Sequence, residues 1–295
     1  MNDAQLSYFR ALYKLGSTSQ AAREANISAQ GLNKSIRMLE CELGVSLFTT
    51  DESGRRTPTR FADVLFRHSE VVNASYASMM TSFEGIKAQQ SKTVRIACSL
   101  GLSGYIATPL VKSFSSVRPD ISFTVREMND RSCDRSLKNN NFDIGFTLAP
   151  FDEDLITIPL KSERVMFWIN EDDSLADKPF IRPFDLNQRT ISIFGEGMKV
   201  RSTLLELMHQ VGAGPAEIVS SNEVFWHYEN ALTGKTVSFA VEHLVKLELF
   251  NRDSAVKAVP LQGMEWQVGI SYSPRSLLPE YARDFFDHTV EYVTR

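Results

Sequence analysis

Residues 60–90 contain no proline, and apolar side chains recur there in steps of four and three. This spacing predicts one long helix with a seam typical of a two-stranded coiled coil. One helix cannot bury such a seam, so the pattern favours pairing with a second copy of the chain; packing on its own domain is the alternative. The seam positions are Leu65, Ser69, Val72, Tyr76, Met79, Phe83 and Ile86.

The residues before this helix predict a small helical head. Leu6, Phe9 and Leu12 share one face of a helix over residues 3–15, which Gly16 ends. Ser17 is placed to cap a short second helix through its side-chain oxygen, and Asn26 suits a left-handed turn after it.

A third helix is predicted from the N-cap candidate Ser28 to Gly44. Its inward stripe is formed by Leu32, Ile36, Leu39 and Leu43, while Ala29, Gln30, Asn33, Lys34 and Arg37 face outward. The outward side chains include groups that hydrogen-bond base edges and phosphates, and the helix order is that of a helix-turn-helix. Any small helical bundle also has polar residues outside, so these residues alone leave both interpretations open.

The head closely resembles that of LysR-type transcription regulators. The matching positions are Leu6, Phe9, Gly16-Ser17, Ala21-Ala22, Ile27-Ser28, Ile36, Leu39-Glu40, Leu43-Gly44-Val45 and Leu47-Phe48. The resemblance implies a winged helix-turn-helix that binds promoter DNA as a homodimer, with a homotetramer as the larger assembly. The DNA-binding candidates are Ser17, Thr18, Ser28, Ala29, Gln30, Asn33, Lys34, Arg37, Arg55 and Arg56.

The head also departs from the family pattern. Ala29-Gln30 replaces the usual Gln-Pro, and Asn33 stands where a Ser is usual. Thr49 and Thr50 follow Leu47-Phe48 without the usual basic residue, so Arg55 and Arg56 are expected to contact phosphates in its place. The operator sequence therefore cannot be transferred from the family.

The remaining chain alternates strand and helix signals. Strands are predicted at 94–98, 121–125 and 143–148, then at 165–169, 191–194, 218–220, 237–241 and 268–272, with helices at 100–117 and 201–211. This order predicts an α/β fold with a parallel sheet. The segments Val94-Arg95-Ile96, Phe142-Asp143-Ile144-Gly145 and Asp185-Leu186 resemble the LysR effector domain, which implies two lobes built like periplasmic binding proteins.

The resemblance also implies a small-molecule effector held in a cleft between the lobes. Ligands in open α/β sheets lie at the carboxyl ends of strands, where helix N-termini offer N–H groups to an anion. The candidates are Ser99, Leu100, Gly101, Ser103, Phe146, Thr147, Phe194, Gly195, Glu196, Gly197, Ser221 and Asn222. The aromatic run 225–228 lines the cleft or covers the sheet, and core packing is favoured.

Composition argues against several other classes of protein. Five scattered histidines and three widely spaced cysteines form no metal or redox motif, so we expect no metal, no cofactor and structural histidines. Neither a signal peptide nor an apolar membrane span is evident, so a cytoplasmic protein is expected. The net charge is −4, but residues 1–90 hold ten Lys and Arg against nine Asp and Glu, which suits a DNA-binding head on an acidic body.

We therefore expect a non-enzymatic, effector-modulated transcription regulator. The predicted domains are a DNA-binding head (1–59), a linker helix (60–90) and an effector domain (91–295), with lobe I at about 91–163 and 269–295 and lobe II at about 164–268. A solute-binding-fold enzyme and a ligand-binding protein without a DNA role are the alternatives. The effector, the operator, the direction of regulation and the exact oligomer do not follow from the sequence.

Overall fold

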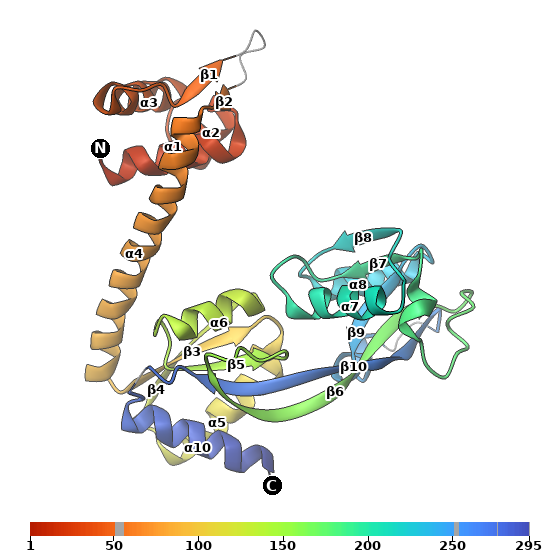
Figure 1. Ribbon diagram of the computed structural model, residues 1–295. Helices are drawn as coiled ribbons and strands as arrows, with labels where there is room; N and C mark the ends of the chain where they lie inside the picture. Colours follow the sequence, from red (N-terminus) through yellow and green to blue (C-terminus); the bar gives the residue numbers. More distant parts are fainter. Residues whose placement is uncertain (51–55, 251–253, 276, 295) are drawn as a thin grey trace. The chain divides into compact units, whose positions relative to one another are not determined.

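The computed structural model describes residues 1–50, 56–250, 254–275 and 277–294. The chain divides into two compact units, Met1–Phe83 and Glu84–Arg295. The predicted domain boundaries, after residues 59 and 90, differ from this division and stay a proposal. Figure 1 shows the elements of each unit.

The first unit begins with three helices, α1 (Asp3–Leu15), α2 (Thr18–Glu24) and α3 (Ala29–Leu43). Gly16 and Gly44 end α1 and α3 in the left-handed conformation, at φ 61° and 68°. A two-stranded antiparallel hairpin of β1 (Phe48–Thr50) and β2 (Arg56–Pro58) follows, and then α4 (Arg60–Gln90), whose last seven residues, 84–90, belong to the second unit. Phe9, Leu12, Leu32, Ile36 and Leu39, all fully buried, form the core.

Two local predictions in this unit are wrong. Ser17 lies at the N-cap of α2, but its side chain accepts no backbone hydrogen bond and lies 3.2 Å from Ser19 Oγ. Ser69 is only 2% exposed because it packs within the unit, where Arg10 Nη1 approaches its carbonyl at 3.4 Å. Ser69 therefore cannot belong to an exposed seam.

The second unit contains a mixed sheet with the strand order β4-β3-β5-β10-β6-β9-β7-β8. Its first lobe is built on β3 (Thr93–Ser99), β4 (Ser122–Met128) and β5 (Ile144–Leu148), its second on β7 (Thr190–Ile193), β8 (Glu217–Ser220) and β9 (Val237–Val241). The long strands β6 (Ile156–Asn170) and β10 (Val256–Tyr272) run through both lobes (Figure 1).

The prediction of a parallel sheet is therefore only partly right. β3 lies parallel to β4 and β5, and β7 lies parallel to β8 and β9, but β10 is antiparallel to both β5 and β6. The sequence also predicted only the ends of β6 and β10. Pro159 and Pro260 interrupt the strand pattern in the sequence, because proline cannot donate a hydrogen bond to a neighbouring strand. In the structure the β6–β10 pairing shifts register after Pro260 and again before Gly269, which pairs with Pro159.

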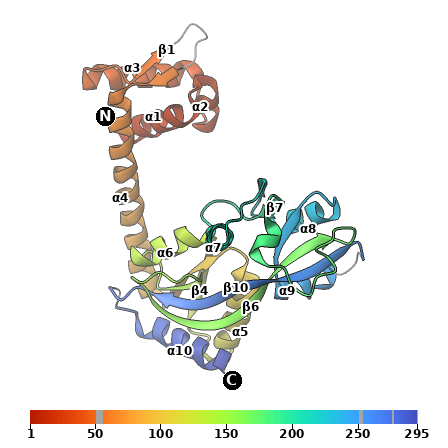
Figure 2. The same cartoon turned by 45° about the vertical axis from the view of Figure 1, so that its right-hand side comes forward.

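Helices cover the sheet in each lobe. A π-helical turn (Ser103–Ala107), α5 (Thr108–Val117), α6 (Asp130–Lys138) and α10 (Glu280–Thr294) belong to the first lobe, and α5 and α10 lie side by side (Figure 2). Arg118 Nη1 and Asp284 Oδ2 join these two segments at 2.6 Å. The second lobe contains α7 (Lys199–Gln210), α8 (Val224–Leu232), α9 (Glu242–Val245) and 3-10 turns at Pro183–Leu186 and Glu248–Phe250.

Candidate functional sites

The outer face of α3 forms the first candidate site. Ser28 Oγ caps the helix by accepting from Gly31 N at 3.0 Å, as predicted. Leu32, Ile36 and Leu39 of the predicted inward stripe are fully buried, but Leu43, in the last turn, is 39% exposed, so its inward placement was wrong. On the opposite face the side chains of Gln30, Lys34 and Arg37 are exposed. A polar hollow on this face is lined by Gln30, Asn33, Lys34, Arg37, Met38 and Cys41. The face therefore presents hydrogen-bonding groups and two cations.

Asn33 is less free than the sequence suggested. Its side chain is half-buried, and its Oδ1 accepts from Arg56 Nη2 at 2.8 Å, which ties β2 to α3. Ser17 and Thr18 are half-buried at the start of α2, and Ala29 is exposed. Arg55 lies outside the described residues. The face thus combines exposed side chains with a positioned pair, Asn33 and Arg56.

The outer stripe of α4 is the second candidate surface. Val72, Tyr76, Met79, Phe83 and Ile86 are between 44% and 57% exposed, although all are large and apolar. Leu65, which was also predicted on this seam, is half-buried against the core of the head. The stripe therefore begins after the first turns of α4, and an exposed run of this kind marks an interaction surface.

The sequence-predicted cleft residues of the first lobe lie mostly inside it. Phe146 is fully buried, and Thr147 is 1% exposed. The Thr147 hydroxyl is 2.6 Å from Ser271 Oγ, which in turn is 2.7 Å from Thr157 Oγ1. Both faces of β5 are covered, so neither side chain reaches an open cleft.

The other first-lobe candidates surround the end of β3. Ser99 is fully buried, and its Oγ has no hydrogen-bond partner among the described residues. Leu100 packs against the core, Gly101 is exposed with φ at 86°, and Ser103 begins the π-helical turn. Gly101 is exposed and Leu100 and Ser103 are half-buried, whereas Ser99 lies in the interior.

The second-lobe candidates cluster at the ends of β7 and β8. Gly195 N donates to Asn222 Oδ1 at 3.2 Å, and Glu196 has a 92% exposed side chain. Gly197 faces the first lobe, where its carbonyl accepts from Arg131 N at 3.1 Å. A Cβ on Gly197 would lie 3.1 Å from Asn129 Cγ, so the close approach of the lobes favours glycine here.

The aromatic run 225–228 lies on α8. Tyr228 is buried against Trp168 and Phe250, as core packing predicts, whereas Phe225 and Trp226 are 45% and 40% exposed. Phe194 contacts the His227 ring edge-on, with ring centroids 5.1 Å apart. Tyr228 therefore packs into the core of the lobe, whereas Phe225 and Trp226 remain exposed on the other side of α8.

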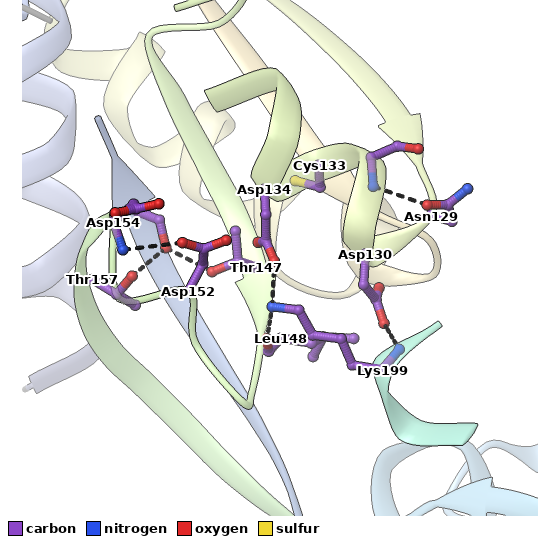
Figure 3. Close-up of polar contacts among 12 residues, drawn as sticks. Asn129, Asp130, Cys133, Asp134, Thr147, Leu148, Asp152, Asp154, Thr157 and Lys199 are labelled. Atoms are coloured by element: carbon purple, nitrogen blue, oxygen red, sulfur yellow. Dashed lines mark hydrogen bonds and ion pairs between the residues drawn. The ribbon is translucent and has the colours of Figure 1, made fainter. Parts of the chain in front are cut away.

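Lys199, at the start of α7, bridges the lobes (Figure 3). Its Nζ donates to Leu148 O and lies beside Asp134 Oδ2, both at 2.7 Å, and its backbone N donates to Asp130 Oδ2 at 2.7 Å. Lys199 is 7% exposed, and burial raises the pKa of both aspartate carboxyl groups. None of these charged residues was predicted from the sequence.

A second contact between the lobes involves β6, one of the two strands that run through both lobes. The Glu163 carboxylate accepts from the Tyr105 hydroxyl and lies 2.6 Å from His243 Nδ1. The Tyr105 and His243 rings stack with centroids 3.9 Å apart, and Lys161 Nζ is 3.1 Å from Glu163 Oε1. Burial and the hydrogen bond to Glu163 raise the pKa of Tyr105 to about 12. This cluster connects the first lobe to α9 of the second.

A cavity of about 390 Å³ lies beside the Lys199 bridge, and we call it the inter-lobe pocket. It is lined by Leu148, Ala149, Pro150, Val200, Thr203, Glu206, Gln210, Met264, Glu265 and Trp266. These residues come from the end of β5, from α7 and from β10. None was predicted from the sequence, because the three segments meet only where β10 passes from one lobe to the other, beside the end of β5 and α7.

No three His, Cys, Asp or Glu side chains among the described residues gather in a way that suits a metal ion. None of the described helices combines the length and apolar character that crossing a bilayer demands.

Two family models match the chain. "Bacterial regulatory helix-turn-helix protein, lysR family" matches residues 4–63, and "LysR substrate binding domain" matches residues 87–294. Among curated proteins, the chain is 22% identical to the HTH-type transcriptional regulator CfxR of Cupriavidus necator, over 99% of this chain and 93% of CfxR. It is 27% identical to the regulatory protein NocR of Agrobacterium fabrum, over 63% of this chain and 62% of NocR.

Solved structures show the same fold. The LysR family regulator HinK from Pseudomonas aeruginosa superposes with a TM-score of 0.59 at 20% identity, covering 98% of this chain and 97% of HinK. Full-length CbnR in complex with its target DNA superposes with a TM-score of 0.52 at 16% identity, covering all of both chains.

Proposed function

This chain belongs to the LysR family of bacterial helix-turn-helix regulators, and from that premise we propose which of its residues bind DNA, pair two copies and sense the effector. The protein is a DNA-binding transcriptional regulator with an effector-binding domain. Its relatives are named regulators, and we propose that it acts by binding, without catalysis, in the cytoplasm.

The observation that supports the DNA interface is the composition of the outer face of α3. Gln30, Lys34 and Arg37 are exposed along it, while Arg56 reaches Asn33 from the hairpin. We propose that α3 enters the major groove, where amide and guanidinium groups contact base edges and phosphates. Arg56 and the hairpin then act as the wing.

The exposed stripe of α4 supports pairing. Tyr76 and Phe83 leave about half of their surface in solvent, at 56% and 49%. A second copy would cover this stripe along the predicted four–three spacing. Two heads held together bind two half-sites, which raises the affinity beyond that of one head. We propose a homodimer as the DNA-binding unit, with a homotetramer as its larger form.

We place the effector in the inter-lobe pocket beside Lys199. The effector shifts DNA binding only if it favours one arrangement of the two lobes, since coupling requires different affinities for the two states. The predicted candidate Gly197 packs against Asn129, next to Asp130 of the bridge, whereas Glu206 and Trp266 line the pocket itself.

The test is a gel shift with DNA from the promoter of the regulator's own gene and from the promoters of the neighbouring genes. Lys34→Ala and Arg37→Ala are each expected to weaken binding roughly tenfold to a hundredfold, because each removes a base or phosphate contact. Lys112→Ala removes an exposed charge from α5 of the second unit and serves as the control. Unchanged affinity in both α3 variants would refute the assigned face.

A further inference from the structure

Asn33 lies in the middle of the polar face of α3. It follows Gln30 by three positions and precedes Arg37 by four, so the three side chains share one side of the helix. All three line the polar hollow on this face. Although its side chain is half-buried, Asn33 therefore belongs to the surface that we propose enters the major groove.

The hairpin fixes the orientation of the Asn33 amide. Arg56 Nη2 donates to Asn33 Oδ1 at 2.8 Å. A guanidinium group only donates hydrogen bonds, so the amide oxygen, and not the amide nitrogen, must be the atom that faces Arg56. Among the described residues, none accepts from Asn33 Nδ2. The amide therefore keeps its two N–H donors available, while its acceptor is already used.

Backbone contacts hold Arg56 in place beside α3. At the start of β1, Leu47 N and Phe48 N both donate to Glu40 Oε1, at 2.7 and 3.3 Å, and Phe48 packs into the core of the head. On β2, Arg56 N donates to Gly16 O at 3.3 Å. Because Glu40 belongs to α3 and Gly16 ends α1, both strands of the hairpin are tied to the helices. The contact between Arg56 and Asn33 is therefore formed before DNA binds.

An asparagine held in this way differs chemically from a free one. A free asparagine recognises adenine by accepting from N6 and donating to N7. Here a cation already donates to Asn33 Oδ1, so an adenine amino group would have to approach the same oxygen beside a positive charge. The Nδ2 hydrogens instead suit a base that presents acceptors. Guanine presents two acceptors, O6 and N7, side by side in the major groove.

We propose that Asn33 selects a G·C base pair in the operator by donating from Nδ2 to guanine, and that Arg56 is the positioning residue that sets this preference by holding Asn33 Oδ1. The inference rests on the proposed DNA interface and adds to it the base that one residue recognises. Arg56 thus contributes to the sequence preference without contacting a base.

The first experiment is the selection of binding sites by the full-length protein from a library of random double-stranded DNA. The base pair that Asn33 contacts is identified as the position whose preference disappears in Asn33→Ala. At that position the wild type is expected to prefer G·C to A·T by about fivefold or more. A preference for A·T there, or the lack of any position that depends on Asn33, overturns the proposal.

The second experiment repeats the selection with Arg56→Ala. Release of Asn33 Oδ1 is expected to shift the preference at the same base pair from G·C to A·T, because the amide can then both donate to adenine and accept from it. Arg60→Ala removes an exposed cation from the start of α4 and is the control, with a preference within about twofold of the wild type. A uniform loss of affinity in Arg56→Ala, with the G·C preference kept, would refute the positioning role.

Arg56→Lys guards against a misfolded hairpin as the cause of the shift. An ammonium group also only donates, so this variant is expected to keep Asn33 Oδ1 occupied and to keep the preference for G·C. Loss of that preference in Arg56→Lys as well as in Arg56→Ala would show that the preference does not depend on a donor to Asn33, and the proposal would fail.

The outcomes separate this inference from the proposed function. If the wild type selects no DNA sequence and binds no promoter in the gel shift, the proposed DNA interface itself fails. If the wild type selects a site whose G·C preference persists in Arg56→Ala, the interface stands and only the role given to Arg56 is wrong.

Discussion

His227 makes the stability of the effector domain depend on pH. The residue is fully buried on α8, its Nδ1 lies 2.8 Å from Ser192 Oγ, and its Nε2 lies 3.0 Å from Ser221 O. Because a carbonyl only accepts, Nε2 carries the proton, and Nδ1 accepts from the serine hydroxyl. The neutral ring is thus fully hydrogen-bonded. Burial lowers the pKa of His227 from 6.5 to about 4.

The sign of the effect follows from these values. The unfolded chain takes up a proton on His227 below pH 6.5, whereas the folded protein resists it down to about pH 4. The contribution to stability is therefore present above pH 6.5 and is lost as the pH falls toward 4. The full shift corresponds to about 3 kcal/mol, of which about 2 kcal/mol is lost between pH 7.5 and pH 5.

The assay is urea unfolding of the wild type and His227→Gln at pH 7.5, 6 and 5. The protein has three tryptophans, Trp168, Trp226 and Trp266, and all lie in the second unit, so their fluorescence reports on that unit. The wild type is expected to lose about 2 kcal/mol more than the variant between pH 7.5 and pH 5. Parallel losses in both proteins would show that His227 is not held neutral.

Three further substitutions, the first with a matched control variant, test other parts of the protein. Ser28→Ala is expected to lower the free energy of unfolding of the head by about 1 kcal/mol, measured by circular dichroism, because Ser28 caps α3. Ser17→Ala is the control and is expected to change this free energy little, because the Ser17 side chain makes no cap hydrogen bond. Equal losses in the two variants would contradict the capping assignment. Gly145→Ala is expected to destabilise the second unit by about 1–3 kcal/mol in urea unfolding, because its Cβ would overlap Leu137 Cδ1, and unchanged stability would contradict this packing. Phe83→Glu is expected to convert the dimer to monomers in analytical ultracentrifugation, and a dimer of unchanged stability would exclude this stripe as the interface.

Short-range patterns predicted the elements of the head well. Ser28, Gly44 and the buried residues Leu32, Ile36 and Leu39 take the predicted roles, because caps and helix periodicity depend on neighbours within one or two turns. Leu43, in the last turn of α3, was predicted to be buried but is exposed. The same local reasoning was wrong for Ser69, which has the spacing of a seam residue but is buried within its own unit. Periodicity gives the face of a helix and does not say which partner covers it.

The effector domain shows the limit of local reasoning more clearly. Thr147 lies at the carboxyl end of a strand, as the topology rule requires, yet its hydroxyl is committed to Ser271 inside the lobe. The pocket is lined instead by residues such as Glu206 and Trp266, which carry no motif. Their role depends on the place where β10 passes between the lobes, next to α7 and the end of β5.

By itself the sequence determined the order of helices and strands, the capped outward face of α3 and the family to which the chain belongs, because these depend on residue types at fixed short spacings. Only the tertiary structure decided that Lys199 meets Asp134 and Leu148 between the lobes, and that the charge beside the pocket is negative. Contacts between segments that are distant in the sequence depend on how the two lobes pack against each other, and no local sequence pattern encodes that packing.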